Sequence, residues 1–339
     1  EKLELPLEYT KKTKTGYSTA VDVLERLAPI APIVSKILEY RQIAKIQSTY
    51  VIGLQDWILE DGKIHTRYVQ DLTQTGRLSS VDPNLQNIPV RLEQGRLIRK
   101  AFVPEEENSV LLSSDYSQIE LRVLAHISGD EHLINAFQHG ADIHTSTAMR
   151  VFNIEKPEDV TANDRRNAKA VNFGIIYGKS DFGLAQDLNI SQKKAKEYIE
   201  SYFNKYETIK AFMDHIVSDA EEKGYSTTMF NRRRYIPEIK SSNFVEKNRG
   251  KRAAMNAPIQ GSAADIIKIA MVNVYNRLKE QGLKSRLILQ VHDELIVEAT
   301  GDELDQVEVL LREEMENAVN LKVDLKVDLN IGKSWYETK

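Results

Sequence analysis

The chain has 339 residues, of which 41% are hydrophobic, and a formal net charge of −4. This length and apolar content predict a globular protein of two or three domains with a packed core. Without cysteine, disulfides and thiolate metal sites are excluded, and no apolar run or signal peptide indicates a membrane span or export, so we expect a soluble, intracellular protein.

The charge is unevenly distributed along the chain. A slightly acidic total argues against a generic nucleic-acid binder, because such domains are usually basic overall. Cations nevertheless gather in short stretches, and a charge run is most often a solvated face. Because several stretches flank the motifs described below, we expect them to follow a phosphate track on one side of the molecule. The basic stretches are residues 11–14, 91–100, 165–169, 232–234 and 247–252.

The first ninety residues predict two helices, a hairpin and a polar loop. Residues 19–50 have helical periodicity interrupted by prolines, which indicates two helices. Residues 57–71 read as a hairpin around the Asp61-Gly62 turn. Residues 73–89 are rich in turn residues, amides and hydroxyls, which suits either a polar surface loop or contacts to backbone phosphates and minor-groove acceptors.

Two acidic clusters each end a short apolar run. Asp115 lies in the segment 111–120 and Asp293 in the segment 288–295. Each pattern predicts a buried strand that delivers a carboxylate to an edge or turn. Two such strands side by side could hold divalent cations, since hard ions prefer oxygen ligands. A single buried ion pair or a pair of strand-end acids is the alternative reading.

A third segment, residues 165–178, places Arg165, Lys169, Phe173 and Tyr177 at successive i, i+4 positions. In a helix these side chains share one face. Two cations followed by two rings suit a polyphosphate at one end and a stacked base or sugar at the other. The alternative is an amphipathic helix that buries its rings and solvates its cations.

The remaining elements are mainly helical, with a second hairpin near the end. Residues 142–240 predict helices at 191–203 and 208–223, and the triplet 232–234 is either solvated charge or a template contact. We also expect a long helix over 256–279 that begins after Pro258, a hairpin formed by 287–289 and 295–297, a helix over 302–319 and a strand over 322–330.

Six motifs together resemble those of family A DNA polymerases. Residues 115–122, the Arg-x3-Lys-x3-Phe-Gly-x2-Tyr-Gly segment and residues 291–295 are similar to motifs A, B and C, and residues 75–80, 82–89 and 258–265 also match in the same order. The resemblance implies an α+β fold: a right-hand polymerase with an antiparallel-sheet palm, helical fingers and a partial helical thumb. The implied ranges are 1–52 for the partial thumb, 53–141 and 241–339 for the two parts of the palm, and 142–240 for the fingers.

The chain opens without methionine, in a stretch that resembles the middle of a domain more than a natural terminus. We therefore expect a fragment, because relatives carry a 5′ nuclease, a 3′–5′ exonuclease-like domain and the first part of the thumb upstream.

The resemblance also implies the reaction, which is that of a DNA-directed DNA polymerase, a nucleotidyltransferase of replication and repair. A primer 3′-hydroxyl attacks the α-phosphate of a deoxynucleoside triphosphate and pyrophosphate leaves, with two Mg²⁺ ions as cofactors and Mn²⁺ as a substitute. Asp115 and Asp293 are the expected catalytic, metal-bridging ligands. The Tyr116 carbonyl is an additional ligand, and Glu294 is an outer or weaker one.

Nucleotide contacts follow from the same resemblance. Lys169 is expected to hold the triphosphate and to protonate the leaving pyrophosphate. Glu120 is expected to lie against the sugar C2′ and to exclude ribonucleotides. The full nucleotide-binding set is Arg165, Lys169, Phe173, Tyr177, Glu120, His144 and Gln118.

The residues expected to touch primer–template DNA are spread along the chain. Lys251 stands where many relatives carry Glu before the arginine, which leaves the partner of Arg252 open. The DNA-binding set is Arg77, Asn84, Gln86, Asn87, Arg91, Arg252, Asn256, Gln260 and His292.

Two other classes of protein remain open. A single-subunit RNA polymerase shares the two-aspartate palm, although Glu120 and Phe173 argue against it, and a DNA-clamping remnant without activity is the second alternative. The expected partners are primer–template DNA and deoxynucleoside triphosphates, with no membrane. We expect a monomer in the bacterial cytoplasm, associated with the nucleoid.

Overall fold

The computed structural model describes residues 5–10, 12–90 and 92–338, and these divide into two compact units. Unit 1 takes the chain up to Tyr68 together with Ser80–Val103 and Ser334–Tyr336. Unit 2 takes Val69–Ser79, Pro104–Lys333 and the C-terminal residues from Glu337. No helix in the described part of the chain is long and apolar enough to cross a membrane.

Unit 1 contains the two helices predicted for residues 19–50. Helix α1 (Val21–Leu27) is followed by α2 (Pro32–Lys45), which continues into the π-helical segment η2 (Ile46–Ile52). Pro32 occupies the first turn of α2, where its missing N–H is not needed. The short elements of this unit are η1 (Leu7–Tyr9), β1 (Lys12–Thr13), β2 (Gly16–Tyr17), η3 (Gln55–Trp57), α3 (Glu93–Leu97) and η4 (Ile98–Ala101).

The hairpin predicted for residues 57–71 is largely wrong. Around the Asp61-Gly62 turn, Ile58 and Ile64 form a single bridge, and the Leu59 N–H donates to the Lys63 carbonyl at 2.9 Å, but no longer strand pair follows in this described stretch. Strand β3 (Arg67–Val69) pairs instead with β4 (Ser79–Val81). The reason is tertiary, because Thr66 Oγ1 lies 2.6 Å from the buried Ser80 Oγ and 2.8 Å from the Pro83 carbonyl oxygen. These bonds fix the chain entering β3 against the polar loop.

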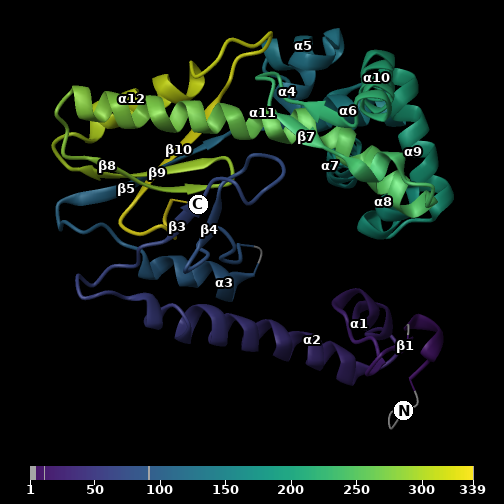
Figure 1. Ribbon diagram of the computed structural model, residues 1–339, viewed down its shortest axis with the longest axis horizontal. Helices are drawn as coiled ribbons and strands as arrows, with labels where there is room; N and C mark the ends of the chain where they lie inside the picture. The colour runs from purple at the N-terminus through teal and green to yellow at the C-terminus, as the bar shows by residue number, and fades with distance from the viewer. Residues whose placement is uncertain (1–4, 11, 91, 339) are drawn as a thin grey trace. The chain divides into compact units, whose positions relative to one another are not determined.

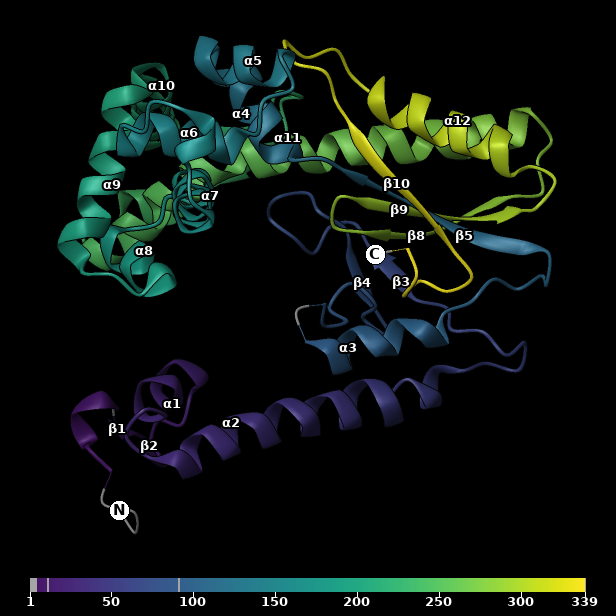
Figure 2. The ribbon, with the colours of Figure 1, turned by 180° about the vertical axis from the view of Figure 1, so that it is seen from behind.

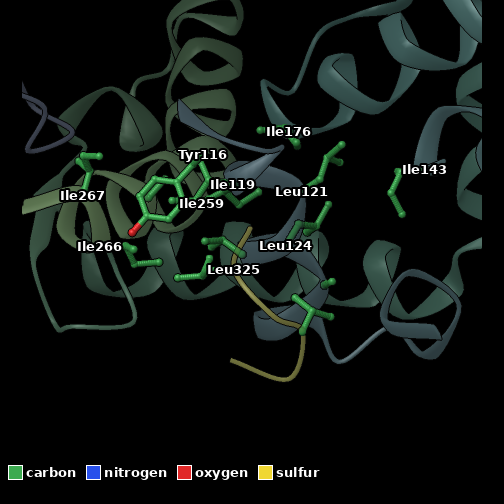
Figure 3. Packing of buried hydrophobic residues seen from close by; sticks show 14 of the residues in the cluster. Tyr116, Ile119, Leu121, Leu124, Ile143, Ile176, Ile259, Ile266, Ile267 and Leu325 are labelled. Carbon is green, nitrogen blue, oxygen red and sulfur yellow. The ribbon is translucent and has the colours of Figure 1, made fainter. Parts of the chain in front are cut away.

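Unit 2 is built on a four-stranded antiparallel sheet in the order β10-β5-β9-β8. The strands are β5 (Ser109–Tyr116), β8 (Arg286–Val291), β9 (Glu294–Thr300) and β10 (Val327–Gly332). The last strand starts five residues later than predicted. Helices α11 (Phe244–Glu280) and α12 (Leu304–Glu316) lie along this sheet in both ribbon views (Figures 1 and 2). Buried side chains of the core, among them Tyr116, Ile259 and Ile266, gather here (Figure 3).

Helix α11 starts fourteen residues before Pro258, although we expected it to start after that proline. Proline lacks an N–H, so the Ala254 carbonyl has no donor within the helix. The Ser226 hydroxyl donates to that carbonyl oxygen at 3.2 Å, which lets the helix pass through Pro258. Asn243 caps the first turn by accepting hydrogen bonds from the N–H groups of Val245 and Glu246.

The rest of unit 2 is a block of helices with one small hairpin, and the helices predicted within residues 142–240 are confirmed. Side-chain caps at Asp142, Thr161, Ser180 and Ser191 fix where four of them begin. The elements are α4 (Ile119–Ser128), α5 (Glu131–Gln138), α6 (Ile143–Phe152), η5 (Pro157–Asp159), α7 (Ala162–Ile176), α8 (Asp181–Leu188), α9 (Gln192–Lys205), α10 (Glu207–Lys223), β6 (Tyr225–Thr227), β7 (Arg233–Tyr235) and η6 (Pro237–Lys240).

Candidate active site

The strand pairing of unit 2 places the two predicted aspartates at the same end of the sheet. Asp115 lies near the end of β5 and is paired with Glu294 on the neighbouring strand β9. Asp293 occupies the turn between β8 and β9, and its carbonyl accepts a hydrogen bond from the Tyr116 N–H at 3.1 Å. His292 adopts a left-handed conformation with φ 56°, and Gln290 Nε2 donates to its carbonyl at 2.5 Å. The backbone therefore fixes both acids.

The charge of one aspartate acts on the other. Burial raises the pKa of Asp293, Arg77 lowers it, and the negative charge of Asp115 raises it further. Two acids close enough for this effect provide the oxygen ligands that a hard divalent cation prefers. The donor set therefore fits such an ion. In the described residues, no group of three or more His, Cys, Asp or Glu side chains is arranged to hold a metal ion.

The two other predicted ligands are held differently. The Glu294 side chain is 3% exposed and accepts a hydrogen bond from Ser113 Oγ at 2.5 Å. Because Ser113 holds the Glu294 carboxylate, this side chain suits a position outside the direct ligands of a bound ion. The Tyr116 ring is buried and its hydroxyl donates to the Met315 carbonyl at 2.6 Å. Only the backbone of Tyr116 could then serve as a ligand.

Glu120 lies in the first turn of helix α4 (Ile119–Ser128) and is only 5% exposed. Arg77 Nη2 lies 2.9 Å from Glu120 Oε1 and 3.9 Å from Asp293 Oδ1. Burial raises the pKa of Glu120, while Arg77 and then the polar groups of Tyr177 and Gln260 lower it. Gln118 precedes α4 in a left-handed conformation with φ 54°.

Helix α7 carries the face that the i, i+4 spacing of Arg165, Lys169 and Phe173 predicted. A capping box between Thr161 and Asp164 starts the helix. Lys169 is exposed, and its side chain has no partner among the described residues. Phe173 and Tyr177 are half-buried and stacked, with ring centroids 6.3 Å apart and an interplanar angle of 17°. The face presents cations at its start and rings at its end.

Asp142 was not singled out from the sequence, yet it connects α6 with the cation at the start of α7. Arg165 Nη2 lies 2.7 Å from Asp142 Oδ2, and Asp142 also caps α6 by accepting from the Thr145 N–H at 2.7 Å. Burial alone would raise its pKa, but the bonds from Arg165 and Thr145 hold the pKa of Asp142 at about 2. The sequence signal was an Asp immediately before Ile143, the first apolar residue of the helix, which is typical of an N-cap.

His144 lies on α6 and is 3% exposed. Its ring centroid is 6.0 Å from that of Phe173. Burial lowers the pKa of His144 to about 4. The negative charge of Asp142 raises this pKa, and the positive charges of Lys169 and Arg165 lower it. The imidazole is therefore neutral at physiological pH.

Three of the residues predicted to contact DNA belong to unit 1, where they form hydrogen bonds that stabilise the polar loop. Gln86 Oε1 accepts from the Ser80 N–H at 3.1 Å, and Asn84 Oδ1 accepts from the Gln86 N–H at 3.0 Å. The Asn87 carbonyl accepts from the Tyr50 hydroxyl at 2.5 Å. Arg91 lies outside the described residues.

The remaining predicted DNA contacts belong to unit 2. Arg252, Asn256 and Gln260 follow one another at i, i+4 on α11, so they share a face of that helix. Lys251 lies 3.5 Å from Glu221, which gives this lysine a partner of its own. His292 is exposed at the β8–β9 turn.

The arginine triplet is not simply solvated charge. Arg232 Nη2 lies 2.6 Å from the buried Asp265, which also accepts from the Thr228 hydroxyl at 2.9 Å. Arg234 Nη2 lies 3.1 Å from Gln74 Oε1. Two of the three arginines therefore fasten the small hairpin within unit 2.

These features define a right-hand polymerase fold. Paired carboxylates lie at one end of its antiparallel palm sheet, and a helix presents cations and aromatic rings. The chain belongs to DNA polymerase family A, whose sequence profile matches residues 1–337.

Known proteins similar to this chain agree with that membership. DNA polymerase I of Streptococcus pneumoniae serotype 4 is 70% identical and that of Geobacillus stearothermophilus 58% identical, each over the whole chain. The chain spans 39% and 38% of the length of these two relatives. The solved structure of the POL domain of Pol1 from M. smegmatis, in complex with DNA primer-template and dNTP, is 46% identical with a TM-score of 0.93, and the match covers all of this chain and 59% of that one.

Proposed function

We propose that this chain catalyses template-directed DNA synthesis, adding deoxynucleoside triphosphates to a primer 3′-hydroxyl with release of pyrophosphate. The observation that carries the proposal is the Asp115 and Asp293 pair at the end of the palm sheet, where the charge of Asp115 raises the pKa of Asp293. The M. smegmatis relative, which was solved with primer-template DNA and dNTP, supports these as partners.

Two Mg²⁺ ions, replaceable by Mn²⁺, are the proposed cofactors. Asp115, Asp293 and the Tyr116 carbonyl would hold them, with Glu294 in an outer position held by Ser113. When bound, such ions activate the attacking hydroxyl and neutralise charge on the triphosphate. The hydrogen bond from the Tyr116 N–H to the Asp293 carbonyl joins the turn that carries Asp293 to the end of β5.

The face of α7 is proposed to bind the nucleotide. Lys169 projects freely from the middle of the face and is available to donate a proton to the leaving pyrophosphate, while Arg165 and His144 contact the phosphates. Phe173 and Tyr177 offer a stacked surface for the sugar and base. Glu120, fixed by Arg77, would occupy the space that a ribose 2′-hydroxyl needs, next to Gln118.

Primer–template DNA is proposed to contact the polar loops and the face of α11, at the residues expected from the sequence. The assignment of thumb, palm and fingers to the four predicted ranges remains part of this proposal. Because the relatives are bacterial proteins, we also propose that the chain acts as a monomer in the bacterial cytoplasm on nucleoid DNA.

Extension of a labelled primer by the purified chain tests the function. We expect extension with deoxynucleotides and a divalent cation, and none after chelation or in an Asp115→Asn, Asp293→Asn double variant. Extension with ribonucleotides instead would favour an RNA polymerase. A mobility shift of primer–template without extension would favour a DNA clamp.

A further inference from the structure

A network of buried polar side chains packs beside Phe173 of α7. It joins α6, α7 and the start of α10. Its members are almost completely buried, and all four carry polar groups that need partners in such an environment. They are His144 at 3% exposed, Thr147 at 0%, Asn172 at 0% and Tyr206 at 1%.

Asn172 is at the centre of this network. Its Nδ2 lies 3.2 Å from His144 Nδ1 and 3.0 Å from Thr147 Oγ1, and its Oδ1 lies 3.2 Å from the same hydroxyl. Thr147 is hydrogen-bonded in turn to the Tyr206 hydroxyl. Both hydrogens of the amide nitrogen are therefore directed at acceptors, one of which is the imidazole.

This contact has a chemical consequence for the histidine. An amide N–H can bond to a ring nitrogen only if that nitrogen carries no proton. The single proton of the neutral imidazole then lies on Nε2, so the ring is a hydrogen-bond donor on its other side. Because Nδ1 is already occupied by a donor, protonation of the ring would place two N–H groups against each other.

We infer that Asn172 is a positioning residue that holds His144 as the Nε2–H tautomer, so that the neutral imidazole donates to the phosphates of the bound nucleotide. The role in nucleotide binding rests on the function proposed above. The charged groups that face His144 are Asp142 on its own helix and Arg165 and Lys169 on α7. A neutral donor beside Arg165 and Lys169 adds no third positive charge to the two cations.

Long-range ¹H–¹⁵N spectra of the imidazoles test the tautomer in the folded chain without DNA or nucleotide. The chain has seven histidines, and a His144→Asn variant assigns the signal. We expect the Nε2–H form throughout pH 6 to 8. An Nδ1–H signal in the wild-type chain would overturn the inference, and this measurement needs no variant of Asn172 to fold.

Asn172→Asp provides the sharpest change. Its carboxylate can only accept, so His144 Nδ1 should acquire a proton and the ring should titrate at a higher pH. Asn163→Asp is the matched control, because it adds the same charge at an exposed position of the same helix. A His144 spectrum that is the same in Asn172→Asp as in Asn163→Asp would contradict the inference.

Kinetics connect the tautomer to the nucleotide. Asn172→Ala should raise the KM for the nucleotide roughly tenfold, with an unchanged Kd for primer–template, as expected for loss of one oriented hydrogen bond. In a His144→Ala background the same change should have little further effect. Equal losses in both backgrounds would point to a merely structural role. If the chain extends no primer at all, the proposed function fails while the spectra still decide the tautomer.

Discussion

Arg77 and Glu120, 43 residues apart in the chain, form an ion pair at the edge of the candidate site, with Arg77 Nη2 2.9 Å from Glu120 Oε1. The carboxylate is buried, so its charge would be costly without a partner. The same guanidinium nitrogen lies 3.9 Å from Asp293 Oδ1. One arginine thus stabilises two acids and joins the polar loop to helix α4.

Replacing Glu120 should change the choice of sugar. We expect Glu120→Ala to relax the exclusion of ribonucleotides. The change empties the space that the carboxylate occupies while it is paired with Arg77. Glu120→Gln is the control, since it retains the volume and should retain most of the exclusion. The measurement is the ratio of kcat/KM for ribonucleotide and deoxynucleotide. An unchanged ratio in the alanine variant would show that Glu120 is not the gate.

Asp115→Asn and Asp293→Asn should each abolish primer extension while leaving primer–template affinity nearly intact. Each change keeps the shape of the side chain and removes a charged oxygen ligand. Single-turnover extension and a mobility-shift titration report the two quantities separately. Retention of more than about a tenth of the wild-type rate by either variant is incompatible with the metal assignment.

The two cations of α7 should differ in their kinetic roles. Lys169→Ala should slow chemistry far more than it weakens nucleotide binding, because its exposed side chain is free to follow the charge that develops on pyrophosphate. Arg165→Ala should mainly raise the nucleotide KM. Pre-steady-state incorporation of one nucleotide separates the two effects. Similar losses in both variants, confined to KM, would mean that the proton donor lies elsewhere.

The ion pair of Asp142 with Arg165 should make stability depend on acid pH. The folded-state pKa of Asp142 is about 2, below the ordinary 3.8, so the carboxylate stabilises the fold above the ordinary value and loses this contribution as pH falls towards 2. Its side chain is 39% exposed, so solvent screening limits the effect to about 1 kcal/mol or less.

Asp142→Asn is the matched variant, because asparagine still caps α6 but does not titrate. Denaturant unfolding at pH 6 and pH 3 measures the effect. The advantage of the wild-type chain over the variant should be present at pH 6 and diminished at pH 3. An advantage that grows as the pH falls would contradict the assignment.

Two glycine-to-alanine changes should have opposite effects on stability. A Cβ at Gly261 would lie 2.6 Å from Thr228 Cγ2, and Thr228 cannot yield easily because Asp265 holds its hydroxyl. Gly261→Ala should therefore destabilise by about 1–3 kcal/mol. At Gly183 the nearest atom is Ser180 Oγ at 3.7 Å, so Gly183→Ala should stabilise α8 by about 0.5–1 kcal/mol. Thermal unfolding of both variants is the test.

The sequence by itself determined the family and, within unit 2, the helices α7, α9, α10 and α12. Periodicity and caps are local properties, so the order of residues alone assigns Arg165, Lys169, Phe173 and Tyr177 to one helix face. The two aspartates can be recognised in the same way, because an apolar run that ends in an acid is a pattern along the chain.

Only the tertiary structure decided which distant groups meet. The start of α11 depended on a hydroxyl from Ser226, thirty-two residues before Pro258, and the partner of β3 depended on bonds from Thr66 to a loop. The pairs Arg77–Glu120 and Asp142–Arg165, and the amide of Asn172 against His144, likewise join separate elements. Hydrogen bonds and ion pairs act over a few ångströms in space, and the order of residues along a chain does not record that proximity.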